Sequence, residues 1–163
     1  MAIFHSMEHV EIERKFLVNS EAFKMDFESK RRITQGFLNT DPERTVRVRI
    51  MDEKAFLTIK GVSSEDGLSR FEWETEIPKT DAEKLLPLCG SEYIDKYRYW
   101  VRCGKHLYEV DEFLGNNQGL IVAELELIHA EEVFEKPGWI GEEVTGQPKY
   151  YNAMLVQHPF INW

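Results

Sequence analysis

The sequence VEIERKFLV, residues 10–18, alternates between apolar and charged side chains near the N-terminus. In an extended chain, successive side chains point to opposite faces, so Glu11, Glu13 and Lys15 share one face. Val10, Ile12 and Phe16 fall on the other face. Strict alternation of this kind is typical of a strand with one apolar and one polar face. The segment therefore predicts a strand that presents a row of charges.

The same period of two recurs along the whole chain, and helical patterns are few. Residues 103–106 have the composition of a hairpin turn. Helices are expected at 21–32, at 81–88 with Thr80 as N-cap, and at 149–157. Such a density of strands predicts a mainly β (α+β) fold, an antiparallel barrel or strongly curved sheet. The further strands are expected at 45–51, 55–60, 70–77, 94–102, 107–113 and 120–128, with an eighth near 34–38.

Length and composition narrow the class of protein. The 163 residues fit a single domain, 1–163, and an apolar content of 42% supports a real core. The formal net charge of −9 disfavours duplex DNA as a partner, and no apolar run has the ~20 residues of a membrane helix. The N-terminus lacks the pattern of a signal peptide. We therefore expect a cytoplasmic monomer or homodimer, with no nucleic-acid or membrane partner and with Cys89 and Cys103 reduced.

The polar faces of the expected strands are nearly all charged, and each strand favours one sign. Residues two apart point the same way from a strand, about 7 Å apart along the chain. One interpretation is a set of solvated outer faces, whose ion pairs contribute only ~0–1 kcal/mol each. The other is a barrel whose lumen holds acidic and basic clusters that face each other, with part of an outer core supplied by Trp73, Tyr97, Tyr99 and Trp100. The acidic pairs are Glu11/Glu13 and Glu124/Glu126, and the basic pairs are Arg47/Arg49 and Lys96/Arg98.

The composition of such a lumen predicts which ligands it would bind. Clustered carboxylates attract hard divalent cations, which prefer oxygen ligands. Clustered Arg and Lys bind phosphate oxygens, with Arg offering a two-pronged fork. A triphosphate carries about four negative charges near neutral pH, and its hydrolysis requires charge neutralisation and an oriented water. The second interpretation therefore predicts a site for a triphosphate-containing small molecule and a metal ion.

Ordered motifs along the chain resemble those of one family, the CYTH superfamily, also called triphosphate tunnel metalloenzymes. Glu11-x-Glu13-x-Lys15 is similar to its N-terminal ExExK signature, and residues 141–152 to its C-terminal segment. The resemblance covers residues 7–159 and leaves 1–6 as an extension. The remaining motifs follow in the family's order: Gln35-Gly36-Phe37, Arg47-x-Arg49, Thr58-x-Lys60-Gly61, Arg70-x-Glu72-x-Glu74, Lys96-x-Arg98, Glu109-x-Asp111 and Glu124-x-Glu126.

This resemblance implies an eight-stranded antiparallel β-barrel that forms a tunnel. Family members bind a triphosphate there and use Mg²⁺ or Mn²⁺. The small bacterial-type members that this chain resembles are metal-dependent tripolyphosphatases, so this activity is the expectation. Two alternatives stay open: a class IV-type adenylate cyclase or another organic triphosphate hydrolase, and a non-catalytic protein that binds polyphosphate or nucleotides.

The resemblance also assigns roles to residues. Metal binding falls to Glu11, Glu13, Asp111, Glu124 and Glu126. Phosphate binding falls to Lys15, Arg47, Arg49, Lys60, Lys96 and Arg98, with Lys149 expected to reach one tunnel mouth from the C-terminal helix. Catalysis is assigned to Glu11, Glu13, Lys15 and Lys60. Glu72 and Glu74 are further tunnel acids, and for Glu72 and Glu109 simple charge balance is an equal alternative.

One position departs from the family pattern. Phe37 stands where many relatives have Tyr, and Phe cannot donate the hydrogen bond that a phenol offers to phosphate. A slower enzyme or a different substrate preference is one consequence. Compensation by Tyr93, Tyr97 or Tyr150 is the other.

Overall fold

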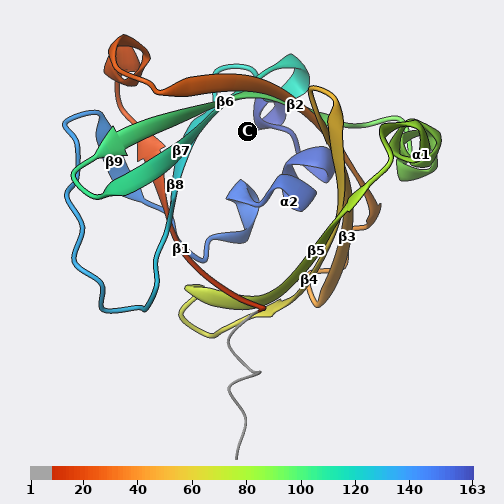
Figure 1. The fold of residues 1–163 in the computed structure, drawn as a ribbon, viewed down its shortest axis with the longest axis horizontal. Coiled ribbons are helices and arrows are strands. Elements are labelled where there is room, and N and C mark those ends of the chain that lie inside the picture. The colour runs from red at the N-terminus through yellow and green to blue at the C-terminus, as the bar shows by residue number, and fades with distance from the viewer. Residues whose placement is uncertain (1–8) are drawn as a thin grey trace, which may run out of the picture.

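A closed antiparallel barrel forms the centre of the molecule in the computed structural model, which describes residues 9–163 (Figure 1). The expected extension at 1–6 lies outside the described residues. Eight strands close the barrel, in the predicted order and number. They are β1 (Val10–Val18), β2 (Ser29–Asn39), β3 (Arg44–Met51), β4 (Lys54–Ser63), β5 (Ser69–Ile77), β6 (Ile94–Cys103), β7 (His106–Phe113) and β8 (Ile121–Glu126).

Strand β1 closes the barrel by pairing on both of its edges. It runs antiparallel to β8 on one edge, and its first residues pair with β5 on the other, from Val10↔Phe71 to Ile12↔Ser69. Farther along, the same edge pairs with a ninth strand, β9 (Ile140–Glu143). This strand was not predicted, because four residues are too short to show a period of two.

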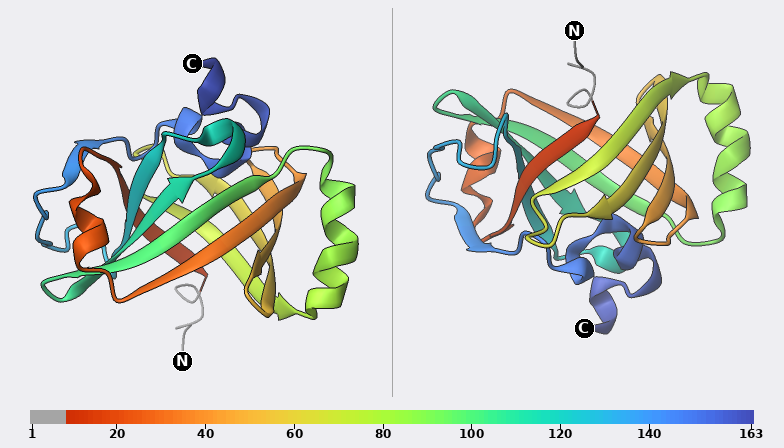
Figure 2. Two further views of the ribbon diagram at one scale, coloured as in Figure 1. Left: turned by 90° about the horizontal axis from the view of Figure 1, so that it is seen from above. Right: turned by 90° about the horizontal axis from the view of Figure 1, so that it is seen from below.

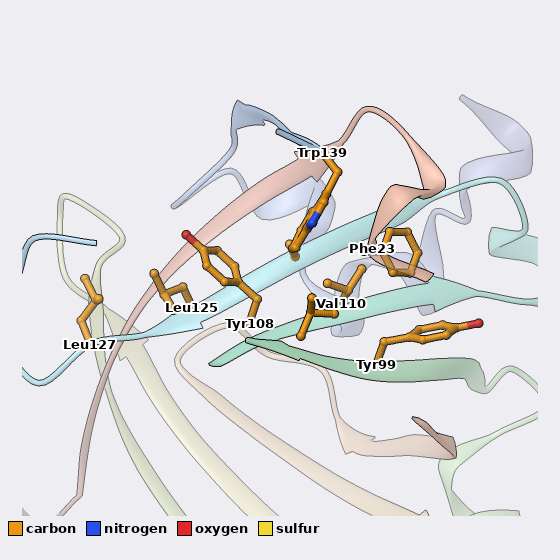
Figure 3. Close-up of a cluster of buried hydrophobic side chains, with 9 residues drawn as sticks. Phe23, Tyr99, Tyr108, Val110, Leu125, Leu127 and Trp139 are labelled. Atoms are coloured by element: carbon orange, nitrogen blue, oxygen red, sulfur yellow. The ribbon is translucent and has the colours of Figure 1, made fainter. Parts of the chain in front are cut away.

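The apolar faces of β6, β7 and β8 point away from the barrel axis and form an outer core (Figure 3). The short 3-10 helix η1 (Glu21–Met25) and Trp139 from the loop after β8 cover them. The fully buried side chains of Phe23 and Tyr108 each contribute roughly 1.5–3 kcal/mol of hydrophobic stabilisation. Because this core lies outside the barrel, the charged faces must point inward.

Two expectations about this outer core need correction. Trp100, expected in it, pairs with Glu109 across the β6–β7 ladder and so shares the inward face. Trp73, expected to be covered, is 37% exposed. Tyr99 is buried in the outer core as expected.

Helices are few, as predicted, but their bounds differ. The expected helix at 21–32 is wrong, because η1 ends at Met25 and Ser29 already begins β2. Tertiary pairing of residues 29–35 with β6 overrides the amphipathic pattern there. Helix α1 (Lys79–Leu85) and the 3-10 turn η2 (Leu86–Cys89) match the expected 81–88, although Pro78 rather than Thr80 is the N-cap.

The C-terminal segment covers one end of the barrel (Figure 2). The expected helix at 149–157 is divided into η4 (Pro148–Tyr150) and α2 (Asn152–Gln157). Asn117, in η3 (Gly115–Asn117), holds the C-terminal segment in place. Its side chain donates a hydrogen bond to the Leu155 carbonyl at 3.3 Å and accepts one from the Phe160 N–H at 2.8 Å. A last turn, η5 (Phe160–Asn162), ends the chain. Residues 144–157 are called the capping segment below.

Two further expectations concern the rest of the molecule. Cys89 and Cys103 are free thiols. Within residues 9–163, no helix has both the length and the apolar character required to span a membrane.

Candidate active site

The barrel encloses a cavity of about 250 Å³, the tunnel cavity, whose lining is mostly charged. The inward parity of seven strands supplies these side chains, as the period of two predicted. Of the sequence-predicted site residues, all but Asp111 and Lys149 line it. They are Glu11, Glu13, Lys15, Arg47, Arg49, Lys60, Glu72, Glu74, Lys96, Arg98, Glu124 and Glu126, joined by Glu109.

Two carboxylates in the tunnel cavity occupy directly opposite positions on neighbouring strands. Glu13 on β1 lies directly opposite Glu126 on β8 in the antiparallel register. Among residues 9–163, neither side chain has a hydrogen-bond or ion-pair partner. Burial, with Glu124 and Glu11 nearby, raises the pKa of Glu13 to about 8. Burial and the charges of Glu11 and Glu109 also raise the pKa of Glu126. Negative charge here is therefore costly until a cation arrives.

The neighbouring carboxylates on the same two strands are paired with lysines. The Lys60 ammonium lies 2.6 Å from Glu11 and 3.3 Å from Glu72. The Lys15 ammonium lies 3.3 Å from Glu124. Burial disfavours both charges of this second pair, but their mutual attraction outweighs it, so the pKa of Glu124 is lowered and that of Lys15 is raised. Lys15 and Lys60 therefore line the tunnel cavity as cations.

The two arginines of β3 that line the tunnel cavity share one carboxylate. Arg47 and Arg49 lie 3.3 and 3.2 Å from the Glu74 oxygens, and Thr58 donates to Glu74 at 2.6 Å. Burial, reinforced by the Arg47 charge, lowers the pKa of Arg49 to about 10, so it remains protonated at neutral pH. Both guanidinium groups keep N–H donors for another acceptor.

Asp111 and Lys149 are the two predicted site residues that do not line the tunnel cavity. Asp111 is 1% exposed and does not line the tunnel cavity. Its oxygens accept hydrogen bonds from Arg98 at 2.7 and 2.8 Å and from Lys96 at 2.7 Å. Lys149 is exposed, and its ammonium lies 4.3 Å from the centroid of the Trp163 ring. The polar atoms of Asp111 are therefore directed at protein cations, and the ammonium of Lys149 lies beside an aromatic ring.

Sequence reasoning expected Lys149 to represent the capping segment at the tunnel and missed the contribution of Tyr151 and its neighbours. Its residues around Tyr151 lie in loops and one short helix, where no periodicity marks them. The Lys15 ammonium lies 5.2 Å from the centroid of the Tyr151 ring, within the range of a cation–π contact. The tunnel cavity is also lined by Phe37, Thr45, Arg70, Thr145, Gly146, Asn152, Ala153 and Met154.

The tyrosines expected to compensate for Phe37 do not line the cavity. Tyr93 donates its hydroxyl to the Leu86 carbonyl, and the ring of Tyr150 packs against Trp163. The tyrosine that does line the cavity is Tyr151.

The donor set determines whether a metal ion fits. Within residues 9–163, no three His, Cys, Asp or Glu side chains form a ready-made metal cage. Mg²⁺ rarely uses such a cage, since it binds through one or two carboxylates, waters and substrate phosphates. Glu13 and Glu126 are an unpaired carboxylate pair of that kind, with the cations of a phosphate site around them. The residues therefore fit a divalent ion that is shared with a phosphate ligand.

Residues 9–155 match the CYTH domain family, which covers most of the chain. The chain belongs to the CYTH family. An inorganic triphosphatase of Acetivibrio thermocellus is 45% identical over 154 residues, 94% of this chain and 97% of the relative. Another from Nitrosomonas europaea is 37% identical over 156 residues, 89% and 95% of the two chains. CYTH membership implies a divalent-metal requirement without specifying the ion.

A solved structure supports the same assignment. The crystal structure of an inorganic triphosphatase is 34% identical to this CYTH chain, with a TM-score of 0.64. The similarity covers 90% of this chain and 97% of that one. Sequence and fold therefore agree over nearly the whole length.

Proposed function

We propose that this protein hydrolyses inorganic triphosphate in its tunnel with Mg²⁺ or Mn²⁺. The observation that carries the proposal is the coexistence, in one enclosed cavity, of a cation set from β1, β3, β4 and β6 with the unpaired carboxylates Glu13 and Glu126. A polyanion would neutralise the cation set, and a divalent cation would neutralise the two carboxylates. Two relatives that cover nearly the same length are named inorganic triphosphatases, which supports this substrate.

The lining suggests how the substrate would be bound. Arg47 and Arg49 from one wall and Arg98 from another would contact phosphate oxygens, since guanidinium forks match phosphate geometry. Lys15 and Lys60, which pair with carboxylates of the lining, would add point charges to those of the three arginines. Phosphoryl transfer depends mostly on such positioning and charge neutralisation.

The reaction would need no covalent protein nucleophile. The oxygen of a water attacks the terminal phosphorus, the bridging P–O bond breaks, and orthophosphate and pyrophosphate leave as one proton is released. A bound divalent ion would withdraw charge from the phosphate oxygens and help to orient the water. Glu13 and Glu126, with Glu11 and Glu124 beside them, would hold that ion. Glu11, Glu13, Lys15 and Lys60 are accordingly proposed as the catalytic group.

A phosphate-release assay with tripolyphosphate and either metal tests the proposal. We expect turnover that chelation abolishes, and a loss of about tenfold or more in kcat/KM for Lys60→Ala. Glu131→Gln, in the exposed loop after β8, is the control and should match the wild type. A folded protein without turnover under either metal would overturn the proposal.

A substrate panel separates the alternatives left open by the sequence. ATP and other organic triphosphates should be poorer substrates than tripolyphosphate, and no cyclic AMP should form from ATP. Tight calorimetric binding of tripolyphosphate without release of orthophosphate would identify a non-catalytic binding protein instead.

A further inference from the structure

Asp111 is the most deeply buried acidic side chain beside the tunnel cavity, and both of its oxygens are occupied by protein cations. The Nε and Nη2 atoms of Arg98 donate to its two oxygens, and the Lys96 ammonium donates to Oδ2. This is the two-pronged geometry that fixes the plane of a guanidinium group. With 1% exposure, the carboxylate has no open path to a ligand.

The cations that Asp111 holds do face the ligand space. Lys96 and Arg98 both line the tunnel cavity, from the wall opposite β4 and β5. Both side chains are long, and ordering such a chain costs up to about 2 kcal/mol of rotamer entropy. A partner behind them removes that cost from ligand binding, because the cations are already oriented when the ligand arrives.

The capping segment completes the same network. Asn152, the first residue of α2, accepts a hydrogen bond from the Lys96 ammonium at 3.0 Å. Lys96 therefore joins the barrel wall, through Asp111, to the segment that covers the tunnel end. Two of its three N–H donors are used in this way, which leaves one for a ligand.

We propose that Asp111 is a positioning residue that orients Lys96 and Arg98 for the triphosphate and does not itself bind the metal. The proposal rests on the proposed function for the identity of the anion. Asn152 also accepts a hydrogen bond from Lys96, so the capping segment contributes to the same orientation.

The sign of one measurement distinguishes positioning from a simple charge effect. Asp111 is negative, so if charge alone mattered, neutralising it would strengthen the binding of an anion in the cavity. If Asp111 orients the two cations, neutralising it weakens that binding instead. A metal-ligand role also predicts stronger anion binding after neutralisation, because without metal such a carboxylate only repels the anion.

The experiment is calorimetric titration of tripolyphosphate into the full chain in the presence of EDTA. For Asp111→Asn we expect the dissociation constant to rise about tenfold or more. Glu13→Gln, which removes a carboxylate without a partner, should lower it or leave it unchanged. Glu112→Gln is the matched control, since its residue neighbours Asp111 on β7 but faces outward to Lys24, and it should bind like the wild type.

Kinetics give a second readout that a merely structural role would not move. In Asp111→Asn, KM for tripolyphosphate should rise more than kcat falls, and the Mg²⁺ concentration for half-maximal activity should stay within about twofold. Tighter anion binding by Asp111→Asn in EDTA, or an Mg²⁺ requirement raised tenfold at constant KM, would overturn the proposal. Because the first titration needs no turnover, failure of the proposed hydrolysis would leave this test intact.

Asn152→Ala keeps the test decisive even if Asp111→Asn does not fold. It removes one acceptor from Lys96 in a segment outside the barrel, and we expect a threefold to tenfold rise in the same dissociation constant. Unchanged binding by a folded Asn152→Ala would overturn the link between the capping segment and Lys96.

Discussion

The acidic side of the tunnel, on β1 and β8, and the cationic side, on β3 and β6, differ in how their charges are held. On the cationic side, Glu74 holds Arg47 and Arg49 of β3, and Asp111 holds Lys96 and Arg98 of β6. On the acidic side, Glu13 and Glu126 lie opposite each other, and neither forms an ion pair with any residue of 9–163. The cations are oriented in advance, whereas two carboxylates await an external partner.

The partners of a buried charged group therefore indicate its role better than its residue type or its position on a strand does. A buried carboxylate whose oxygens are filled by arginine and lysine acts on those cations. A buried carboxylate without a donor has a raised pKa and gains most from a metal ion. Asp111 and Glu13 look alike in the sequence, yet the structure places them in opposite classes.

The largest expected effect comes from breaking the cationic side. Arg98→Ala would leave Asp111 buried with only Lys96 beside it, and removing one partner of a buried ion pair costs about 3–5 kcal/mol of unfolding free energy. Urea unfolding monitored by circular dichroism measures this loss. A loss below about 1 kcal/mol would mean that Asp111 is solvated and not held as described.

Breaking the acidic side should affect function but not stability. Glu13→Gln is expected to reduce kcat/KM for tripolyphosphate by about 100-fold, the scale of disturbing a metal site. The thermal midpoint of the metal-free protein should be unchanged or higher, because an unpaired buried carboxylate is removed. Phosphate release and a thermal melt of the same preparation test both signs. A marked drop in the melting point would show that Glu13 has a stabilising partner.

The two sides could be predicted from the sequence only in part. Alternation along β1, β3, β6 and β8 predicted which residues face inward, because a strand has a fixed period of two. It could not show that Asp111 turns both oxygens to Arg98 and Lys96, since pairing depends on the register between strands. The contacts of Tyr151 and Asn152 with the tunnel could not be predicted, because both residues follow a loop, where spacing carries no directional information.

A smaller effect is expected from the metal ion alone. A divalent ion that binds only the folded protein stabilises it by about 1.4 kcal/mol at ten times its dissociation constant, or about 3–6 °C for a chain of this size. Mg²⁺ or Mn²⁺ should raise the melting temperature of the wild type, and EDTA should reverse the shift. The same titration of Glu13→Gln should give little or no shift. An equal shift in both proteins would place the ion elsewhere.

The smallest effect concerns a carboxylate outside the tunnel that, unlike Glu13, has donors. The Ile128 N–H, together with His106 and Lys105, lowers the pKa of Glu132 to about 2. Because the folded-state pKa lies below the ordinary value of 4.5, the stabilisation is present above that pH. It is lost as the pH falls from about 4.5 toward 2, so melting temperatures should drop over that window. Glu132→Gln should flatten this part of the pH profile and lower stability slightly at neutral pH.

For Glu13 the raised pKa reverses the sign, so that its contribution to stability is present below about pH 4.5 and is lost as the pH rises toward 8. Melting curves of both glutamine variants from pH 3 to 9 therefore test the comparison directly, since profiles that shift in the same direction would show that the two carboxylates are held alike.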